Sequence, residues 1–151
     1  MIRWQKVIKL AVTVALIPSI AIVAVVWDEW RVDRDYYDAR KLLYRARAKA
    51  MDAHLGPITV RFTEHEAITE DQSGQAIESL SLPTLDEVRF RTVRGDRQVI
   101  FAAGGGQTNP FNVHLHGGDF TFKGWTGYSR SIWIHCTGGI TSGRNDDWVL
   151  K

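Results

Sequence analysis

The sequence predicts an α+β chain in which one long N-terminal transmembrane and amphipathic helix precedes a small antiparallel, sandwich-like β-domain. Three observations point to this fold class: an uncharged apolar run, a charged segment with the 3.6-residue period of a helix, and a C-terminal part with the two-residue period of strands. The 151 residues suit one ordinary domain, and 24% charged residues argue against wholesale disorder. The expected divisions are the anchor 1–30, the amphipathic helix 31–56 and the β-domain 57–151.

The uncharged run, Leu10–Trp27, has the length of a membrane-spanning helix. Its 18 residues would cover ~27 Å as a helix, close to the ~30 Å hydrocarbon core of a bilayer. Bases precede the run and acids follow it: Arg3, Lys6, Lys9, Asp28 and Glu29. Because basic flanks stay in the cytoplasm, we expect a single-pass anchor with its C-terminal domain across the membrane.

Two other interpretations of this run are weaker. A signal peptide would be cleaved at Ser19-Ile20-Ala21, but this site falls inside the apolar run instead of after it. A buried core helix is disfavoured because a soluble domain of this size rarely surrounds 18 uncharged residues. We therefore expect an intact N-terminus.

The segment 28–55 carries a narrow apolar stripe at helical spacing. Its members recur at steps of three and four residues: Val32, Tyr36, Ala39, Leu43, Ala46, Ala50 and Ala53. Gly56-Pro57 ends the pattern, because proline cannot continue the helix. The segment therefore predicts a helix that packs its small apolar side chains against the rest of the protein.

The charged residues of this helix are expected in solvent. One side holds bases with no acid among them: Arg40, Lys41, Arg45, Arg47 and Lys49. We interpret this side as a solvated face in preference to a surface for acidic lipid or nucleic acid. The acids that follow the apolar run are interpreted in the same way: Asp28, Asp33, Asp35 and Asp38.

After Pro57, apolar and polar side chains alternate in several short segments. The apolar sets are Ile58/Val60/Phe62, Val88/Phe90, residues 98–103, Phe111/Val113/Leu115, Phe120/Phe122 and Ile132/Ile134/Cys136. Turn residues separate these segments, a pattern typical of an antiparallel sandwich or open barrel and not of a parallel α/β sheet. The polar residues 70–84 are expected to form a loop with weak strand character.

Candidate chemistry is sparse. His114 and His116 lie two apart on a predicted strand, so both could reach one metal ion, with Asp119 and His135 as additions. The further ligands of a closed site are lacking, and we expect no metal and no cofactor. The single cysteine, Cys136, alternates with core residues, which suits a small hydrophobe better than a nucleophile. The sequence therefore predicts no enzymatic activity and no small-molecule substrate.

A resemblance to a known family is carried by three stretches: Ala39–Phe62, Val99–Gly104 and Arg130–Ile140. They resemble type IV pilins and type II secretion pseudopilins, and most closely the H class of minor pseudopilins (GspH/FimT-like). Ala39–Phe62 is similar to the passage from helix to first strand in that family. Val99–Gly104 is similar to its "hydrophobic-x-Phe-x-x-Gly" strand and turn, and Arg130–Ile140 to its terminal strand. The long helix followed by a β-domain has the same layout.

The resemblance implies a pilin-like fold and a structural role in a type II secretion or type IV pilus system. The partners it implies are other pilin-like or pseudopilin subunits and inner-membrane lipid. It places the chain in the bacterial inner membrane, with a cytoplasmic N-terminus and a periplasmic domain. The assembly helix would use the stripe at Tyr36, Ala39, Leu43, Ala46, Ala50 and Ala53.

One departure from the family pattern affects assembly. Pilin-like proteins begin with a Gly-Phe-Thr-Leu-x-Glu signature, which prepilin peptidase cuts after the glycine. The corresponding stretch, Trp4–Lys9, has neither the glycine nor the glutamate and holds two lysines. This argues against peptidase processing and against filament insertion through that carboxylate.

Three alternatives to this role stay open. The chain could be a bitopic protein whose periplasmic domain serves another envelope assembly, or a metal-binding domain built on His114 and His116. Capture of DNA is the least favoured, because the tail Ser142–Lys151 balances Arg144 and Lys151 against two aspartates.

Overall fold

The computed structural model describes residues 2–52, 56–90, 97–102, 118–135 and 138–143, of which 2–17, 90 and 142–143 are described by their backbone alone. Within these residues the chain forms one helix and eight strands. They are α1 (Ile2–Met51), β1 (Ile58–Phe62), β2 (Glu66–Glu70), β3 (Ala76–Ser81), β4 (Leu85–Phe90), β5 (Gln98–Phe101), β6 (Gly118–Lys123), β7 (Ser129–Ile134) and β8 (Ile140–Gly143). The fold is α+β, as the sequence predicts.

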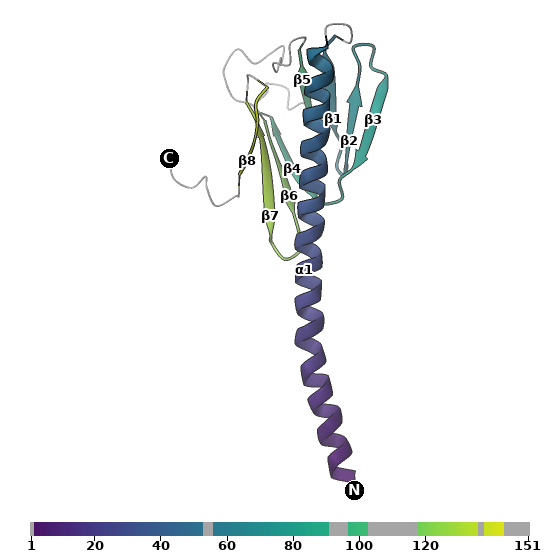
Figure 1. Cartoon of the computed structure of the whole chain (residues 1–151), viewed down its shortest axis with the longest axis vertical. Helices are drawn as coiled ribbons and strands as arrows, with labels where there is room; N and C mark the ends of the chain where they lie inside the picture. Colours follow the sequence, from purple (N-terminus) through teal and green to yellow (C-terminus); the bar gives the residue numbers. More distant parts are fainter. Residues whose placement is uncertain (1, 53–55, 91–96, 103–117, 136–137, 144–151) are drawn as a thin grey trace, which may run out of the picture.

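The strands form two antiparallel sheets of four strands each. The first sheet has the order β3-β2-β1-β5, and the second has the order β4-β6-β7-β8. β1 pairs with both β2 and β5, so that Val60 lies opposite Thr69 and Val99. In Figure 1 the two sheets lie on either side of α1, which runs along both of them with its C-terminal half.

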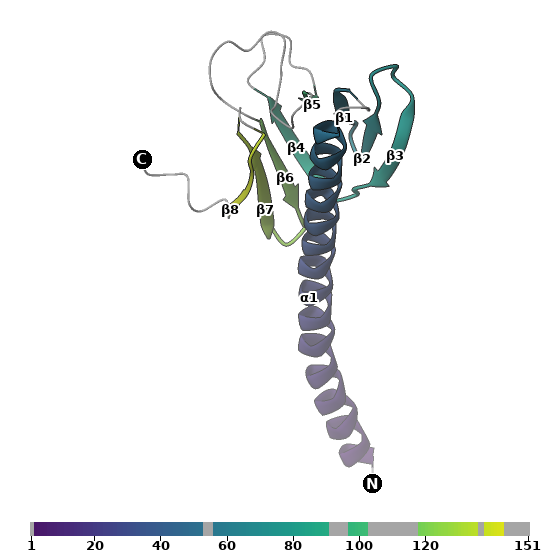
Figure 2. The ribbon, with the colours of Figure 1, turned by 45° about the horizontal axis from the view of Figure 1, so that its top comes forward.

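The helix is much longer than the domain it covers. Its 50 residues span ~75 Å, and its N-terminal half extends beyond the sheets in both views (Figures 1 and 2). The helix passes through Pro18 and continues without interruption to Met51. It thus ends a few residues before the predicted stop at Gly56-Pro57, and residues 53–55 lie outside the described residues.

The apolar stripe predicted for the helix is buried in the core. Tyr36, Leu43 and Ala50 have no exposed area, and the stripe shares one cluster with the inward side chains of both sheets. Phe62 of the first sheet and Phe120 of the second bring their ring centroids within 4.2 Å. The helix and the two sheets are therefore held by one continuous core.

Residues 70–84, which the sequence analysis expects to be a loop, contain strand β3. This correction has a physical reason, because β3 is an edge strand and most of its side chains are exposed. Main-chain pairing with β2, from Glu66 opposite Ser81 onward, holds it, and of its apolar side chains only Leu80 packs against the core. β2 is also missing from the prediction because its buried positions are Ala67 and Thr69, which are small or polar.

Other predicted strand segments have mixed outcomes. The alternating sets in β1, β5, β6 and β7 are confirmed, with Ile58, Phe101 and Phe122 all fully buried. The predicted strand around Phe111/Val113/Leu115 lies outside the described residues, as does Cys136. The final strand β8 follows Gly138-Gly139 and is not among the predicted segments, the last of which is Ile132/Ile134/Cys136.

Candidate functional site

The part of α1 that extends beyond the sheets exposes apolar side chains. Ile20, Val23 and Val26 are 65%, 67% and 59% exposed, and Ile22, Trp27 and Trp30 are comparable. Because consecutive residues point about 100° apart on a helix, the four consecutive exposed residues Ile20–Val23 together reach all of its sides. An apolar helix that is not covered by its own chain needs another apolar environment.

One side of this exposed segment forms a shallow apolar depression of about 430 Å³. Its lining residues follow the i, i+3, i+4, i+7 spacing of helix contacts: Ser19, Ile20, Val23, Ala24 and Trp27. Ser19 and Ala24 are small, which lets another backbone approach closely. We call this side the helix seam.

Aromatic and basic residues mark the end of the exposed apolar segment. The Arg31 guanidinium lies 4.8 Å from the centroid of the Trp27 ring, and that of Arg34 lies 5.4 Å from Trp30. Such pairs of rings and cations suit a boundary between an apolar region and water.

In the part of the chain that the structure describes, no helix combines the length and the apolar character needed to cross a membrane. The predicted span begins at Leu10, and the side chains up to residue 17 lie outside the described residues. The membrane anchor therefore stays a prediction.

Just beyond the exposed segment, Asp28 attaches the helix to the turn between β6 and β7. Its carboxylate is 1% exposed and accepts hydrogen bonds from the Thr126 N–H at 3.0 Å and the Thr126 hydroxyl at 2.7 Å. The approach requires glycine at position 124, because a Cβ there would lie 2.1 Å from Asp28 Oδ2.

The charge of Asp28 is retained despite its burial. Burial raises the pKa of this carboxyl, but the two Thr126 donors, the Trp125 N–H and the positive charge of Arg31 together outweigh it. The pKa of Asp28 therefore lies below its ordinary value, and the group stays ionised at neutral pH.

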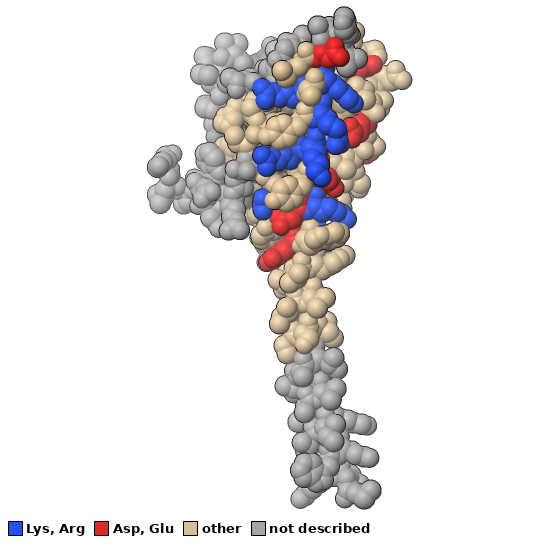
Figure 3. Space-filling view, in the orientation of Figure 1, with Lys and Arg blue, Asp and Glu red and all other residues tan. Residues whose placement is uncertain are grey.

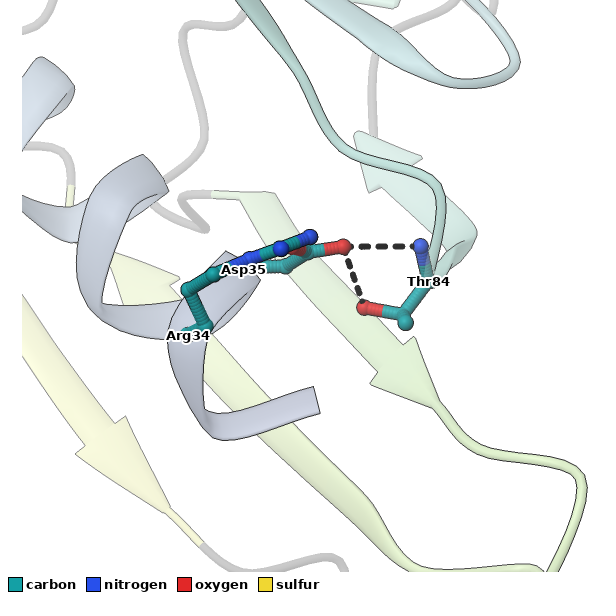
Figure 4. Close-up of polar contacts among 3 residues, drawn as sticks. All are labelled: Arg34, Asp35 and Thr84. Atoms are coloured by element: carbon teal, nitrogen blue, oxygen red, sulfur yellow. Dashed lines mark hydrogen bonds and ion pairs between the residues drawn. The ribbon is translucent and has the colours of Figure 1, made fainter. Parts of the chain in front are cut away.

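Two helical turns later, Asp35 makes an equivalent attachment to the start of β4 (Figure 4). The carboxylate is 1% exposed, and Oδ2 accepts from the Thr84 N–H at 2.9 Å and from its hydroxyl at 2.8 Å. Its other oxygen, Oδ1, receives the guanidinium of Arg34 at 2.8 Å. The carboxylate charge is thus paired, as buried charges need to be.

A third aspartate joins the helix to β7. Asp33 Oδ1 accepts from the Tyr128 hydroxyl at 3.0 Å and from Arg130 at 3.2 Å. The Arg130 guanidinium also lies 4.3 Å from the centroid of the Tyr36 ring. Burial lowers the pKa of Arg130, but opposing interactions, which include those with the Tyr128 hydroxyl and the Asp33 charge, outweigh this effect. The pKa therefore lies above its ordinary value, and the guanidinium stays charged.

These attachments correct the prediction that the four aspartates are solvated. Asp28 and Asp35 are buried, whereas the side chains of Asp33 and Asp38 are 37% and 40% exposed. The sequence holds the signal that was missed: Asp28 and Asp35 are seven residues apart and share a helix face with Val32 and Ala39. A polar residue that continues an apolar stripe is a candidate for a buried hydrogen-bonded group.

The basic side of the helix is partly exposed, because Arg40, Arg47 and Lys49 are half-buried, and Figure 3 shows blue residues along the upper part of α1. Lys41 and Arg45 are 68% and 49% exposed, in line with the expected solvated face. Arg45 forms an ion pair with Glu78 of β3, which links the helix to the edge of the first sheet.

The structure places the residues predicted for assembly inside the protein itself. Tyr36, Ala39, Leu43, Ala46 and Ala50 are at most 1% exposed, and Ala53 lies outside the described residues. Their role in assembly stays a prediction. The exposed surface at Ile20 and Val23 belongs instead to the predicted anchor.

The weak candidates for metal ligands are not brought together within the described residues. His114 and His116 lie outside them, and no group of three or more His, Cys, Asp or Glu side chains gathers at metal distance among those that are described. His135 is exposed, with Nε2 3.2 Å from the Thr141 hydroxyl.

Comparison with solved structures shows a pilin-like fold. The chain is similar to the type IV minor pilin FimU of Pseudomonas aeruginosa, with a TM-score of 0.56 and 13% sequence identity. The match covers 77% of this chain and 90% of the FimU chain. Neither a protein-family model nor a curated protein sequence matches the chain.

Proposed function

We propose that this protein is a non-catalytic, pilin-like structural subunit of a bacterial type II secretion or type IV pilus system. In this proposal it belongs with the H class of minor pseudopilins, its helix is anchored in the inner membrane, and its β-domain lies in the periplasm. The fold shared with FimU and the three sequence stretches that resemble the H class support this assignment.

One observation carries the proposal: α1 changes its surroundings along its length. From Val32 to Ala50 its apolar face is buried against the sheets, whereas from Ile20 to Trp27 its apolar side chains are exposed on all sides. Lipid or other apolar helices would remove this second surface from water. Rigid attachment through Asp28 and Asp35 would then fix the orientation of the β-domain relative to the membrane.

Two lysines near the N-terminal end of the helix limit the kind of assembly. Lys6 and Lys9 stand near the cytoplasmic end of the anchor, and lysines disfavour a deep position in an apolar helix bundle. The protein would therefore occupy a tip or low-copy position and associate with other pilin-like subunits without forming polymers alone.

Affinity capture from cells tests the proposal. The full chain, extracted in mild detergent, is compared with a version that lacks residues 2–27, which retains Asp28 and Asp35 and hence the aspartate attachments. We expect the full chain to recover pilin-like subunits and the shortened chain to recover none. Capture of no pilin-like subunit by the full chain, or polymerisation of the purified protein alone, would contradict the proposal.

A further inference from the structure

The outer face of the second sheet carries a polar groove with a volume of about 670 Å³, within the ~300–1,000 Å³ range of small-ligand sites. It lies on β4, β6 and β7, on the side away from the core, because the neighbouring Phe120, Phe122 and Ile132 point inward. The aspartate attachments and the helix seam do not contribute to it.

The strand register arranges the groove residues in rows across the sheet. Arg89 of β4 lies opposite Asp119 of β6, which lies opposite Trp133 of β7. Two residues along, Glu87 and Thr121 are opposite each other, and Thr121 continues the row to Ser131. Directly opposed side chains in antiparallel strands are ~4.5–5.5 Å apart, so each row presents adjacent functional groups.

Internal contacts hold these rows in position. Arg89 forms a 2.5 Å ion pair with Glu87, and the Thr121 and Ser131 hydroxyl oxygens are 3.3 Å apart. Ser131 and Thr121 are buried at the floor, whereas Trp133 is half-buried beside them. The groove thus presents hydroxyls and charges next to one indole ring.

The charges of the lining residues nearly cancel. Three carboxylates, Asp86, Glu87 and Asp119, stand against two cations, Arg89 and Lys123. A nucleic acid or another polyanion would meet an excess of acids, and a strongly cationic ligand would meet both cations. The charge balance therefore favours an uncharged ligand with many hydrogen-bonding groups.

A saccharide has this chemistry. Its hydroxyl groups donate to carboxylates and accept from Arg, Lys and Ser, while its apolar C–H face can pack on an aromatic ring. The row Arg89–Asp119–Trp133 offers a donor, an acceptor and a ring side by side. Hydrogen bonds to charged groups are also stronger than those between neutral groups.

We propose that this groove binds a neutral oligosaccharide, with the sugar ring on Trp133 and its hydroxyl groups on Asp119 and Arg89. This inference goes beyond the proposed structural role and does not depend on it, because the groove is separate from the helix. An assembly subunit with this site would bind a nearby glycan on the outer face of the second sheet.

Titration calorimetry on the full chain tests the site. The protein is kept in a detergent without a sugar headgroup and is titrated with tetrasaccharides of glucose, galactose, mannose and N-acetylglucosamine. We expect at least one of them to bind with a Kd of about 1 mM or tighter. Trp133→Ala and the isosteric Asp119→Asn should each weaken that binding by about tenfold or more.

Trp125→Ala is the matched control, because Trp125 is 66% exposed on the turn outside the groove. It should leave the affinity unchanged. Should Trp133→Ala unfold the domain, Asp119→Asn alone decides the outcome, with folding followed by circular dichroism.

Binding of none of the four saccharides, or equal affinity in the Asp119 variant and the parent, would overturn the inference. Binding of acidic or basic peptides in place of saccharides would overturn it as well. The capture of pilin-like subunits is measured independently, so the two proposals can fail separately.

Discussion

Replacing Gly124 by alanine should destabilise the attachment between the helix and the β6–β7 turn. The added Cβ would stand 2.1 Å from Asp28 Oδ2 and 2.7 Å from its carboxyl carbon, distances that no pair of non-bonded atoms keeps. The turn must move away from the helix, and the Thr126 hydrogen bonds at 3.0 Å and 2.7 Å then lengthen or break.

The size of the effect follows from what Asp28 loses. A hydrogen bond to a charged group contributes ~1.5–3 kcal/mol, and two such bonds hold a carboxylate that is only 1% exposed. Because the opened site admits some water, we expect a loss of about 3 kcal/mol in the free energy of unfolding. For a chain of this size, that corresponds to a fall in Tm of roughly 6–12 °C.

Thermal denaturation followed by circular dichroism measures this change, and a double-mutant cycle tests its cause. In an Asp28→Ala background the space beside residue 124 is free, so Gly124→Ala should cost less than about 1 kcal/mol there. Gly127→Ala is the control in the same turn, since its Cβ would meet no atom within 4 Å. The φ of 89° at position 127 strains an alanine, so Gly127→Ala should cost about 1–2 kcal/mol from the backbone alone.

The reasoning is refuted if Gly124→Ala is as harmful with Asp28→Ala as without it. It is also refuted if Gly124→Ala and Gly127→Ala have equal effects in the parent chain.

Three further predictions concern the buried stripe, the aspartates and the N-terminus. Ala46→Glu should prevent folding or cost several kcal/mol in the free energy of unfolding, because position 46 is 1% exposed. Ala48→Glu, on the exposed side of the helix, should be nearly neutral in thermal melts. Equal effects of the two substitutions would contradict the buried stripe. Because the pKa of Asp28 is lower in the folded protein than the ~3.9 of an unfolded chain, its stabilisation is present above that value and is lost as the pH falls through the folded pKa. Melts between about pH 2 and pH 6 should therefore show a shallower acid dependence for Asp28→Asn than for the parent, and identical curves would count against the buried ionised group. N-terminal sequencing and protease access from the outer side should find an intact N-terminus with an accessible β-domain, and a chain starting near Ile22 would show cleavage instead.

Regular periodicity explains what the sequence could predict. The stripe from Val32 to Ala50 and the alternating sets in β1, β6 and β7 concern large or repeated apolar side chains, whose burial follows from secondary structure alone. Edge strand β3 could not be found in this way, because main-chain pairing with β2 holds it and most of its side chains are exposed.

Features that join distant parts of the chain were not predictable from pattern. Asp28 and Asp35 resemble ordinary polar residues of a helix until the fold brings Thr126 and Thr84 against them, 98 and 49 residues away in the sequence. The groove likewise depends on the pairing of β4 with β6, which the sequence separates by a long connection. A local pattern cannot encode such neighbours.

The central claim, that the exposed part of α1 packs against pilin-like subunits, is tested most directly by site-specific photo-cross-linking in cells. A photoreactive residue replaces Val23 on the helix seam or Ile22 on another side of the helix; these positions are 67% and 64% exposed, so their reactivity is matched. We predict cross-links from position 23 to pilin-like subunits, identified by mass spectrometry, at several times the yield from position 22. Equal yields at the two positions would contradict packing through the helix seam. The absence of any pilin-like subunit at either position would contradict the central claim.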